Sequence, residues 1–182
     1  MKDGYIKVAA ATPKVKVADT VYNGQLIKAL MKECTDNGAK VVVFPELCIT
    51  GYTCQDLFRQ GLLIEQAELS VMKLLDFTRS LDIISIVGVP IVAGDLLLNC
   101  GMVIQKGTIL GVVVKTFLPN YSEFYEKRWF SSSQDLKPTE IRFAGRTVKL
   151  SASHKVFRTY DGVTFGVEIC EDVWSPNPPS NE

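Results

Sequence analysis

Histidine is almost absent from this sequence of 182 residues: His154 is the only one, and it lies in a polar segment. A catalytic cysteine and histidine pair is therefore a weak proposal. The cysteines are an odd set without any Cys-x-x-Cys spacing, namely Cys34, Cys48, Cys54, Cys100 and Cys170. Zinc sites commonly use such spacings with companion histidines, and disulfide frameworks commonly use an even number of cysteines, so the pattern argues against both. We expect no bound metal.

Neither sign of charge dominates, and no long hydrophobic run is present. The 20 basic and 20 acidic side chains are scattered, which argues against nucleic acid or an anionic membrane surface as a partner. The longest apolar stretch, residues 83–94, contains Pro90 and is shorter than the roughly 18 residues of a membrane-spanning helix. The first residues lack the apolar core of a signal peptide, so we expect a cytoplasmic protein with small-molecule partners.

The first half of the chain alternates strand and helix patterns. Residues 6–11 and 41–44 are apolar runs typical of strands, and 41–44 is continuous enough to be covered on both faces. Between them we predict a helix that begins at Asp19 or Thr20 and stops at Asn37-Gly38, with a buried stripe at Ile27, Leu30, Met31 and Cys34. A second helix over 62–80 and a strand over 83–89 complete another βαβ unit, so the fold class is α/β.

After residue 89 the pattern changes. Residues 96–105 and 108–115 are strand-like runs joined at Lys106-Gly107, which predicts a hairpin and hence a mixed sheet. Residues 116–138 form a long stretch of aromatic and polar residues, and such irregular segments in compact domains are commonly functional. Short strands are predicted at 148–150, 156–160 and 163–169. The last of these alternates apolar and polar residues after an Asp161-Gly162 turn.

Three chemically capable residues each follow an apolar strand directly: Glu46 after 41–44, Lys115 after 109–114, and Cys170 after 163–169. Open α/β sheets bind ligands beyond the carboxyl ends of their strands, and neighbouring strand ends could bring the three together.

A thiol that attacks an amide needs a base, a cation or N–H donors for the oxyanion, and a proton for the departing amine. Glu46 can take and return the proton. The attraction between the Lys115 charge and an anion about 4 Å away is on the order of 4 kcal/mol at an effective dielectric near 20, which would stabilise a thiolate or an oxyanion. Taken alone, Cys170 could equally be a small buried hydrophobe.

The motifs around these residues resemble those of the nitrilase superfamily of carbon-nitrogen hydrolases. They are Phe44-Pro45-Glu46-Leu47 with Thr50-Gly51-Tyr52, then Lys115 with Leu118-Pro119-Asn120-Tyr121, then Cys170. More narrowly, residues 118–130 and the run Cys170-Glu171-Asp172-Val173-Trp174 resemble the amidase domain of the glutamine-dependent NAD synthetase family. Each motif alone is weak evidence, but three in this order, each in its strand context, make a strong signal.

The resemblance implies an α-β-β-α sandwich with mixed sheets. It implies that Glu46 is the general base, that Lys115 and the backbone N–H of Glu171 stabilise the tetrahedral intermediate, and that Cys170 is the nucleophile. Glu126 matches a second glutamate of the family that would hold Lys115 in place, although a surface ion pair with Lys127 or Arg128 is an alternative. The residues expected around bound glutamine, which could equally be packing residues, are Tyr52, Tyr121, Glu171 and Trp174.

The same resemblance implies a role in NAD biosynthesis. Glutamine is hydrolysed through a cysteine thioester without a cofactor, and the ammonia passes to a synthetase domain of the same polypeptide. There, ATP and magnesium support amidation of nicotinic acid adenine dinucleotide. Family domains continue past the cysteine, so we expect residues 1–182 to be a partial amidase domain, truncated at the C-terminus, with its remainder and the synthetase domain beyond residue 182. An exposed sheet edge would favour homo-oligomers.

Two other functions stay open at this point. A free-standing nitrilase-type amidase, or a hydrolase of carbamoyl amino acids, would use the same three residues, but the run from Cys170 to Trp174 argues against it. A non-catalytic scaffold would keep the fold for binding or assembly without the chemistry. The intact set of Glu46, Lys115 and Cys170 argues against a scaffold.

Overall fold

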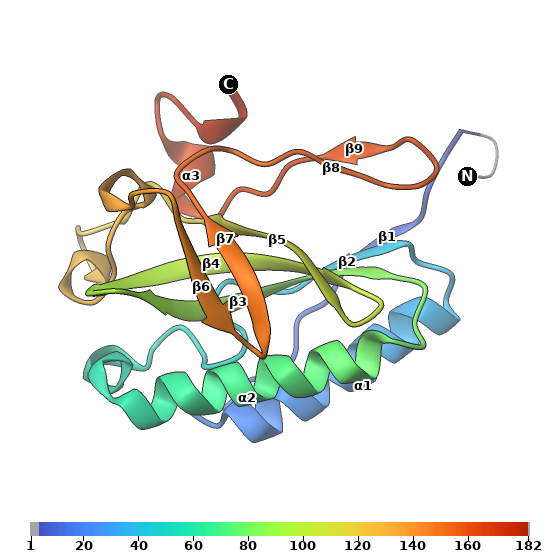
Figure 1. The fold of residues 1–182 in the computed structure, drawn as a ribbon, viewed down its shortest axis with the longest axis horizontal. Helices are drawn as coiled ribbons and strands as arrows, with labels where there is room; N and C mark the ends of the chain where they lie inside the picture. Colours follow the sequence, from blue (N-terminus) through green and yellow to red (C-terminus); the bar gives the residue numbers. More distant parts are fainter. Residues whose placement is uncertain (1–3, 182) are drawn as a thin grey trace.

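The computed structural model describes residues 4–181, which contain a mixed five-stranded sheet with two long helices on one face (Figure 1). Residues 1–3 and 182, which the expected domain 1–182 includes, lie outside the described residues. The strands stand in the sheet in the order in which they occur in the sequence. They are β1 (Val8–Ala10), β2 (Val41–Val43), β3 (Ile84–Ala93), β4 (Leu96–Gln105) and β5 (Thr108–Val114).

The first three strands are parallel because a helix connects each strand to the next. Helix α1 (Thr20–Asp36) links β1 to β2, and α2 (Gly61–Thr78) links β2 to β3. The Asp19 carboxylate accepts a hydrogen bond from the Tyr22 N–H at the start of α1, and Gly38 follows the end of α1 with a φ of +80°. The predicted start and stop of this helix are confirmed.

The remaining strands of the sheet are antiparallel. Lys106 and Gly107 connect β4 to β5 with φ angles of +46° and +77°, and two left-handed residues in succession are what a type I′ hairpin turn requires. The predicted hairpin and the mixed sheet are therefore confirmed. Because β5 is antiparallel to β4, and β4 to β3, the carboxyl end of β5 lies at the same edge of the sheet as that of β2.

The main hydrophobic core lies between the sheet and the two helices. It contains the predicted positions Ile27 and Met31 of α1 and most of one face of α2, namely Ala67, Val71, Leu74 and Leu75. A second hairpin, β6 (Thr139–Phe143) and β7 (Arg146–Leu150), extends this core with Phe143, Val148 and Leu150. The turn of that hairpin is held by the Ala144 N–H, which donates to Glu68 Oε1 of α2 at 2.7 Å.

The opposite face of the sheet is only partly covered. A short hairpin of β8 (Phe157–Arg158) and β9 (Thr164–Phe165) packs its stacked Phe157 and Phe165 rings against sheet residues that include Val41, Ile84, Val103 and Val113. Val43 is 42% exposed. The expectation that 41–44 is covered on both faces is therefore wrong at Val43, because the small hairpin covers only part of this face.

The last predicted strands are shorter than expected. β8 and β9 pair only through Phe157 with Phe165 and Arg158 with Thr164, so 156–160 and 163–169 are not continuous strands. In the described residues, 166–169 have no ladder partner, and Cys170 does not follow a strand directly. The alternation that suggested a strand survives as alternating burial over 163–167, where Thr164 and Gly166 are exposed and the residues beside them are partly buried. Strand β6 was not predicted, since its Ala144-Gly145 turn lacks the usual Asn-Gly signal.

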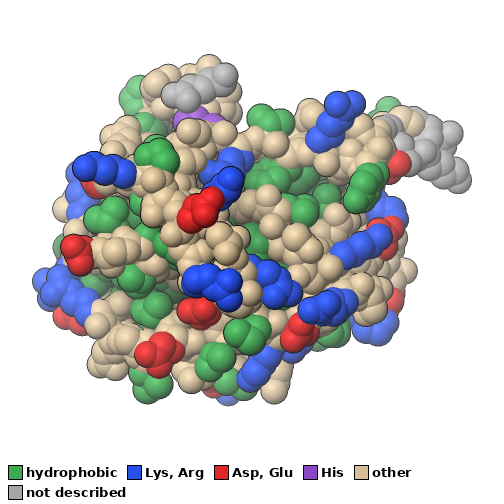
Figure 2. All heavy atoms as spheres, viewed as in Figure 1, with side chains coloured by type: hydrophobic (Ala, Val, Ile, Leu, Met, Phe, Trp, Pro, Cys, Tyr) green, Lys and Arg blue, Asp and Glu red, His purple; other side chains and the backbone are tan. Residues whose placement is uncertain are grey.

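Short helices occur in the irregular segments. They are η1 (Gln55–Arg59), η2 (Glu126–Arg128), η3 (Ser133–Asp135), α3 (Glu171–Trp174) and η4 (Pro179–Asn181). On the face drawn in Figure 2, Lys and Arg side chains are interspersed with Asp and Glu side chains. Within residues 4–181, no helix is long and apolar enough to cross a membrane.

Candidate active site

Glu46 reaches the middle of the sheet because its loop crosses directly over β3. Two hydrogen bonds fasten the ends of the loop to the backbone of β3. The Phe44 N–H donates to the Ile86 carbonyl at 2.9 Å, and the Ile49 N–H donates to the Gly88 carbonyl at 3.2 Å. A Cβ at Gly88 would lie 2.6 Å from the Pro45 carbonyl oxygen and 2.8 Å from the Glu46 carbonyl carbon. Only glycine fits under the loop without displacing it.

Lys115 meets Glu46 from the far side of this crossing. The sequence analysis expected neighbouring strand ends to bring these residues together. In the structure β2 and β5 are not neighbours, because β3 and β4 lie between them. The Glu46 loop spans that gap, so Lys115 Nζ lies 2.6 Å from Glu46 Oε1 and 2.8 Å from Glu126 Oε1. Lys115 is completely buried. An ammonium group is thus held between two carboxylates at the carboxyl edge of the sheet.

Glu126 is a buried member of this cluster. It lies in η2 and does not form the alternative surface pair with Lys127 or Arg128, since Arg128 instead pairs with Asp56. The Tyr52 hydroxyl donates to Glu126 Oε1 at 2.7 Å. The other carboxylate oxygen of Glu126, Oε2, is buried with no hydrogen-bond partner in the structure.

Burial and charge act in opposite directions on this cluster. Burial alone would lower the pKa of Lys115, but the Glu46 charge and the hydrogen bonds to Glu126 and Glu46 outweigh it and raise that pKa. Burial raises the pKa of Glu126, and Lys115 only partly offsets this effect. Burial and then the hydrogen bond to Glu126 raise the pKa of the Tyr52 hydroxyl. At neutral pH, Lys115 is therefore a fixed positive charge and Tyr52 a hydrogen-bond donor.

Cys170 occupies a strained turn immediately before α3. Its φ of +50° and ψ of −104° are unusual for a residue with a side chain, and such outliers gather at functional sites. Burial raises the pKa of its thiol, the Glu46 charge and a hydrogen bond to Glu46 raise it further, and Lys115 opposes them. The resting group is thus a neutral thiol next to a carboxylate, and it needs a base before it can act as a nucleophile.

Asp172, which the sequence reasoning did not identify as a site residue, ties the Cys170 turn to the segment after Lys115. One carboxylate oxygen accepts the Thr116 N–H at 3.0 Å and the Phe117 N–H at 2.8 Å, and the other accepts the Ile169 N–H at 3.4 Å. Asp172 is buried, and burial raises its pKa while these three N–H donors oppose the rise. The thiol and the ammonium are consequently fixed relative to each other by backbone contacts.

The residues expected around bound glutamine differ in their contacts and in their exposure to solvent. The Tyr121 hydroxyl donates to Glu171 Oε2 at 2.9 Å, and Tyr52 and Tyr121 both contact the Phe124 ring edge to face. These residues form one aromatic and acidic group, and the hydrogen bond from Tyr52 to Glu126 joins this group to the cluster. Trp174 is 78% exposed, so it is not buried against them. Among residues 4–181, no three His, Cys, Asp or Glu side chains lie together as a metal site.

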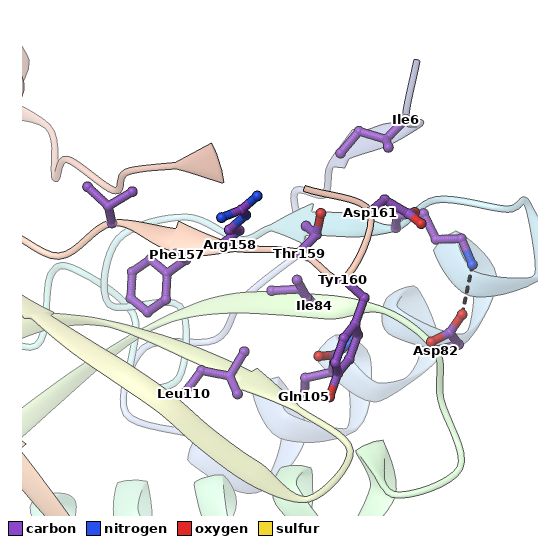
Figure 3. Close-up of a pocket in the computed structure, with 12 residues that line it drawn as sticks. Ile6, Asp82, Ile84, Gln105, Leu110, Phe157, Arg158, Thr159, Tyr160 and Asp161 are labelled. Carbon is purple, nitrogen blue, oxygen red and sulfur yellow. Dashed lines mark hydrogen bonds and ion pairs between the residues drawn. The ribbon is translucent and has the colours of Figure 1, made fainter. Parts of the chain in front are cut away.

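Two cavities lie at opposite ends of the sheet. A small one of about 90 Å³ is bounded by Glu46, Gly88, Gly101, Glu168 and Cys170, among others. A larger one of about 680 Å³ lies under the tip of the β8–β9 hairpin, where Figure 3 shows Tyr160 and Asp161 above Gln105 and Asp82. None of the predicted site residues lines the larger cavity. The small cavity therefore places the Glu46 carboxylate and the Cys170 thiol at one space, and Lys115, which does not line this cavity, bonds to Glu46.

Comparisons with known proteins agree with this geometry. The family model for carbon-nitrogen hydrolases matches residues 7–179. The chain is 35% identical over 181 residues to a glutamine-dependent NAD(+) synthetase of Mycobacterium tuberculosis, covering 98% of this chain and 26% of that protein. It is 32% identical over 161 residues to one of Aquifex aeolicus, covering 88% and 25%. The chain thus spans about a quarter of the length of these relatives.

Solved structures match the fold. A glutamine-dependent NAD(+) synthetase from Cytophaga hutchinsonii superposes with a TM-score of 0.82 at 26% identity, covering 91% of this chain and 28% of that one. An amidase from Nesterenkonia sp. superposes with a TM-score of 0.72 at 18% identity, covering 94% and 57%. These matches confirm the expected mixed α/β fold of the nitrilase type.

Proposed function

The chain belongs to the carbon-nitrogen hydrolase family, and we propose that it is the glutamine-hydrolysing part of an NAD synthetase, releasing ammonia from the side-chain amide of glutamine. The observation that carries the proposal is the buried Lys115 between Glu46 and Glu126, at the same edge of the sheet as the Cys170 thiol. The names of the relatives support glutamine as the substrate and NAD synthesis as the use of the ammonia.

The first half of the reaction forms a thioester. Glu46 takes the proton of Cys170, and the sulfur attacks the amide carbon of glutamine. The negative charge that develops on the amide oxygen is stabilised by Lys115 and by the Glu171 N–H in the first turn of α3. The tetrahedral intermediate collapses, the carbon–nitrogen bond breaks, and Glu46 returns its proton to the leaving nitrogen. The products of this half are ammonia and a γ-glutamyl thioester on Cys170.

The second half releases glutamate. Glu46 takes a proton from water, the hydroxide attacks the thioester carbon, and the carbon–sulfur bond breaks. The sulfur recovers a proton from Glu46, which restores the resting thiol. We assign substrate binding to Tyr52, Tyr121 and Glu171, because Tyr52 bonds to Glu126 of the cluster and Tyr121 bonds to Glu171, the residue after Cys170. No cofactor takes part in either half.

The use of the ammonia lies outside residues 1–182. The relatives are about four times as long as this chain, which supports a synthetase domain in the same polypeptide as the acceptor. That domain would bind ATP and magnesium and amidate nicotinic acid adenine dinucleotide. We also propose a cytoplasmic, homo-oligomeric protein, on the sequence grounds given above.

The test measures ammonia release from glutamine by this chain and by any longer polypeptide that its gene encodes. We expect release by the wild type and none above background by Cys170→Ala, with Cys34→Ala as a matched control because that thiol lies in α1, outside the site. A glutamine-like chloroketone should label Cys170 selectively. Faster hydrolysis of a carbamoyl amino acid or another small amide than of glutamine would overturn the substrate assignment. An unlabelled Cys170 with no ammonia release from any amide would favour a scaffold.

A further inference from the structure

We propose that Asn99 is a positioning residue that fixes Glu46 for proton transfer with Cys170. This inference rests on the proposed function, in which Glu46 is the base. Asn99 lies in the middle of β4, in the apolar run Leu96-Leu97-Leu98-Asn99-Cys100, and is completely buried. Its side-chain amide therefore has a fixed environment within the sheet.

The two oxygens of Glu46 differ in their hydrogen bonds: Oε1 accepts from Asn99 and Lys115, and Oε2 does not. Asn99 Nδ2 donates to Glu46 Oε1 at 2.5 Å, and Lys115 Nζ donates to the same oxygen at 2.6 Å. A carboxylate oxygen has two lone pairs directed at acceptor positions, and both positions on Oε1 are thus occupied. The other oxygen, Oε2, is left to exchange a proton with the thiol.

Asn99 also fixes the position of Lys115. The Lys115 N–H donates to the Asn99 carbonyl at 2.9 Å, immediately after the paired residues of β4 and β5. One residue of the central sheet therefore holds the base through its side chain and the cation through its backbone. Glu46, on a loop, is positioned by a rigid strand.

Packing alone does not explain an amide at this position. Asn99 Oδ1 is buried without a hydrogen-bond partner, and a buried acceptor without a partner lowers stability. An apolar side chain of similar volume, such as leucine, would avoid that loss. The donor side of the amide is the part that has a partner, and the partner is Glu46.

The test is a double-mutant cycle on the whole chain. Asn99→Leu and Glu46→Gln are made singly and together, and kcat and KM for glutamine are measured with the rate of Cys170 alkylation by iodoacetamide. We expect Asn99→Leu to lower kcat about 100-fold with KM within about threefold, because a small displacement of a catalytic group costs about that much. In the Glu46→Gln background, Asn99→Leu should change neither rate further.

Ser85→Ala is the matched control, since Ser85 is also buried in the sheet with an unpaired side-chain oxygen and lies outside the site. It should leave kcat and the alkylation rate unchanged. If Asn99→Leu does not fold, Asn99→Asp replaces it, because it has nearly the same shape and lacks the amide donor. Folding is checked by circular dichroism.

The outcomes separate this inference from the proposed function. Independent, multiplicative effects of the Asn99 and Glu46 variants, or a rise in KM alone, would overturn the positioning role. Glutamine turnover at the wild-type rate in a folded Asn99 variant would do the same while leaving the function intact. If the chain does not hydrolyse glutamine, the rate of Cys170 alkylation can still support the role. That rate should fall in Asn99→Leu and stay unchanged in Ser85→Ala. It should not fall further when Asn99→Leu is added to Glu46→Gln.

Discussion

The two ends of the central sheet carry the same kinds of side chain in opposite environments. At the carboxyl end of β2, Lys115 is buried between Glu46 and Glu126. At the amino end, the Lys40 and Asp82 side chains form an ion pair with 49% and 62% of their surfaces exposed. The cavity is about 680 Å³ at the amino end and about 90 Å³ at the carboxyl end.

The comparison teaches that burial of charge, and not cavity size, distinguishes the candidate active site. Exposed ion pairs are screened by water and contribute little to stability. Buried charges are costly to desolvate and persist only with well-placed partners, so a convergent buried set next to a thiol points to chemistry. The larger cavity lacks such a set, although it is lined by Lys40, Asp82, Arg158 and Asp161.

Lys115→Met should cause the largest loss of unfolding free energy, and it tests whether charge is buried at one end of the sheet only. It leaves Glu46 and Glu126 without their shared counter-ion, and breaking a buried pair in this way costs about 3 to 5 kcal/mol of unfolding free energy. Urea unfolding at pH 7 measures this loss. Lys32→Met is the matched control, because its partner Asp36 is exposed, and it should change the unfolding free energy by less than about 1 kcal/mol.

The loss in Lys115→Met should also depend on pH. Burial raises the pKa of Glu126, and removing Lys115 removes a group that opposes the rise. A carboxyl whose folded pKa is raised favours the native state at low pH and disfavours it as pH rises through that value. The variant should therefore lose less stability at pH 5 than at pH 8. A pH-independent loss, or one below about 1 kcal/mol, would show that the two ends do not differ as argued.

Gly88→Ala should have the next largest effect, through geometry. The new Cβ would meet the backbone of the Glu46 loop, which cannot yield without moving the carboxylate. We expect glutamine turnover to fall about 100-fold, with a loss of about 1 to 3 kcal/mol in unfolding free energy from overpacking. Gly24→Ala is the control, because Gly24 is a buried glycine of α1 outside the site, where the new Cβ would lie 3.6 Å from Ser70 Cβ. Equal effects of both variants would exclude the loop crossing as the cause.

The sequence predicts the residues of the cluster better than the contacts that assemble it. Glu46 and Lys115 could be identified because each follows an apolar strand, and Cys170 because of the motif that follows it. The strand expected before Cys170 does not form, since a period of two in the sequence sets which side chains are buried but not whether a partner strand is present.

Contacts that join distant segments could not be predicted. The crossing at Gly88 and the three N–H groups that bind Asp172 depend on how loops pack on the sheet, which local patterns do not encode. Asn99 did leave a signal, because a lone amide within a buried apolar run demands a polar partner. Its partner, Glu46, is 53 residues away in the chain, so only the folded arrangement identifies it.

Asp82→Asn should have the smallest effect, at the amino end of the sheet. The hydrogen bond and charge of Lys40 lower the pKa of Asp82, so its contribution is present above the pKa of an unfolded aspartate, about 3.9, and is lost as pH falls through the lowered value. Because the pair is exposed, we expect a loss of less than about 1 kcal/mol at pH 7. Urea unfolding should show this difference shrinking below about pH 4, and also in about 1 M salt, where the screening length is roughly 3 Å. A loss above about 2 kcal/mol that survives salt would mean that this end also holds a buried charge network, and burial would no longer separate the two ends.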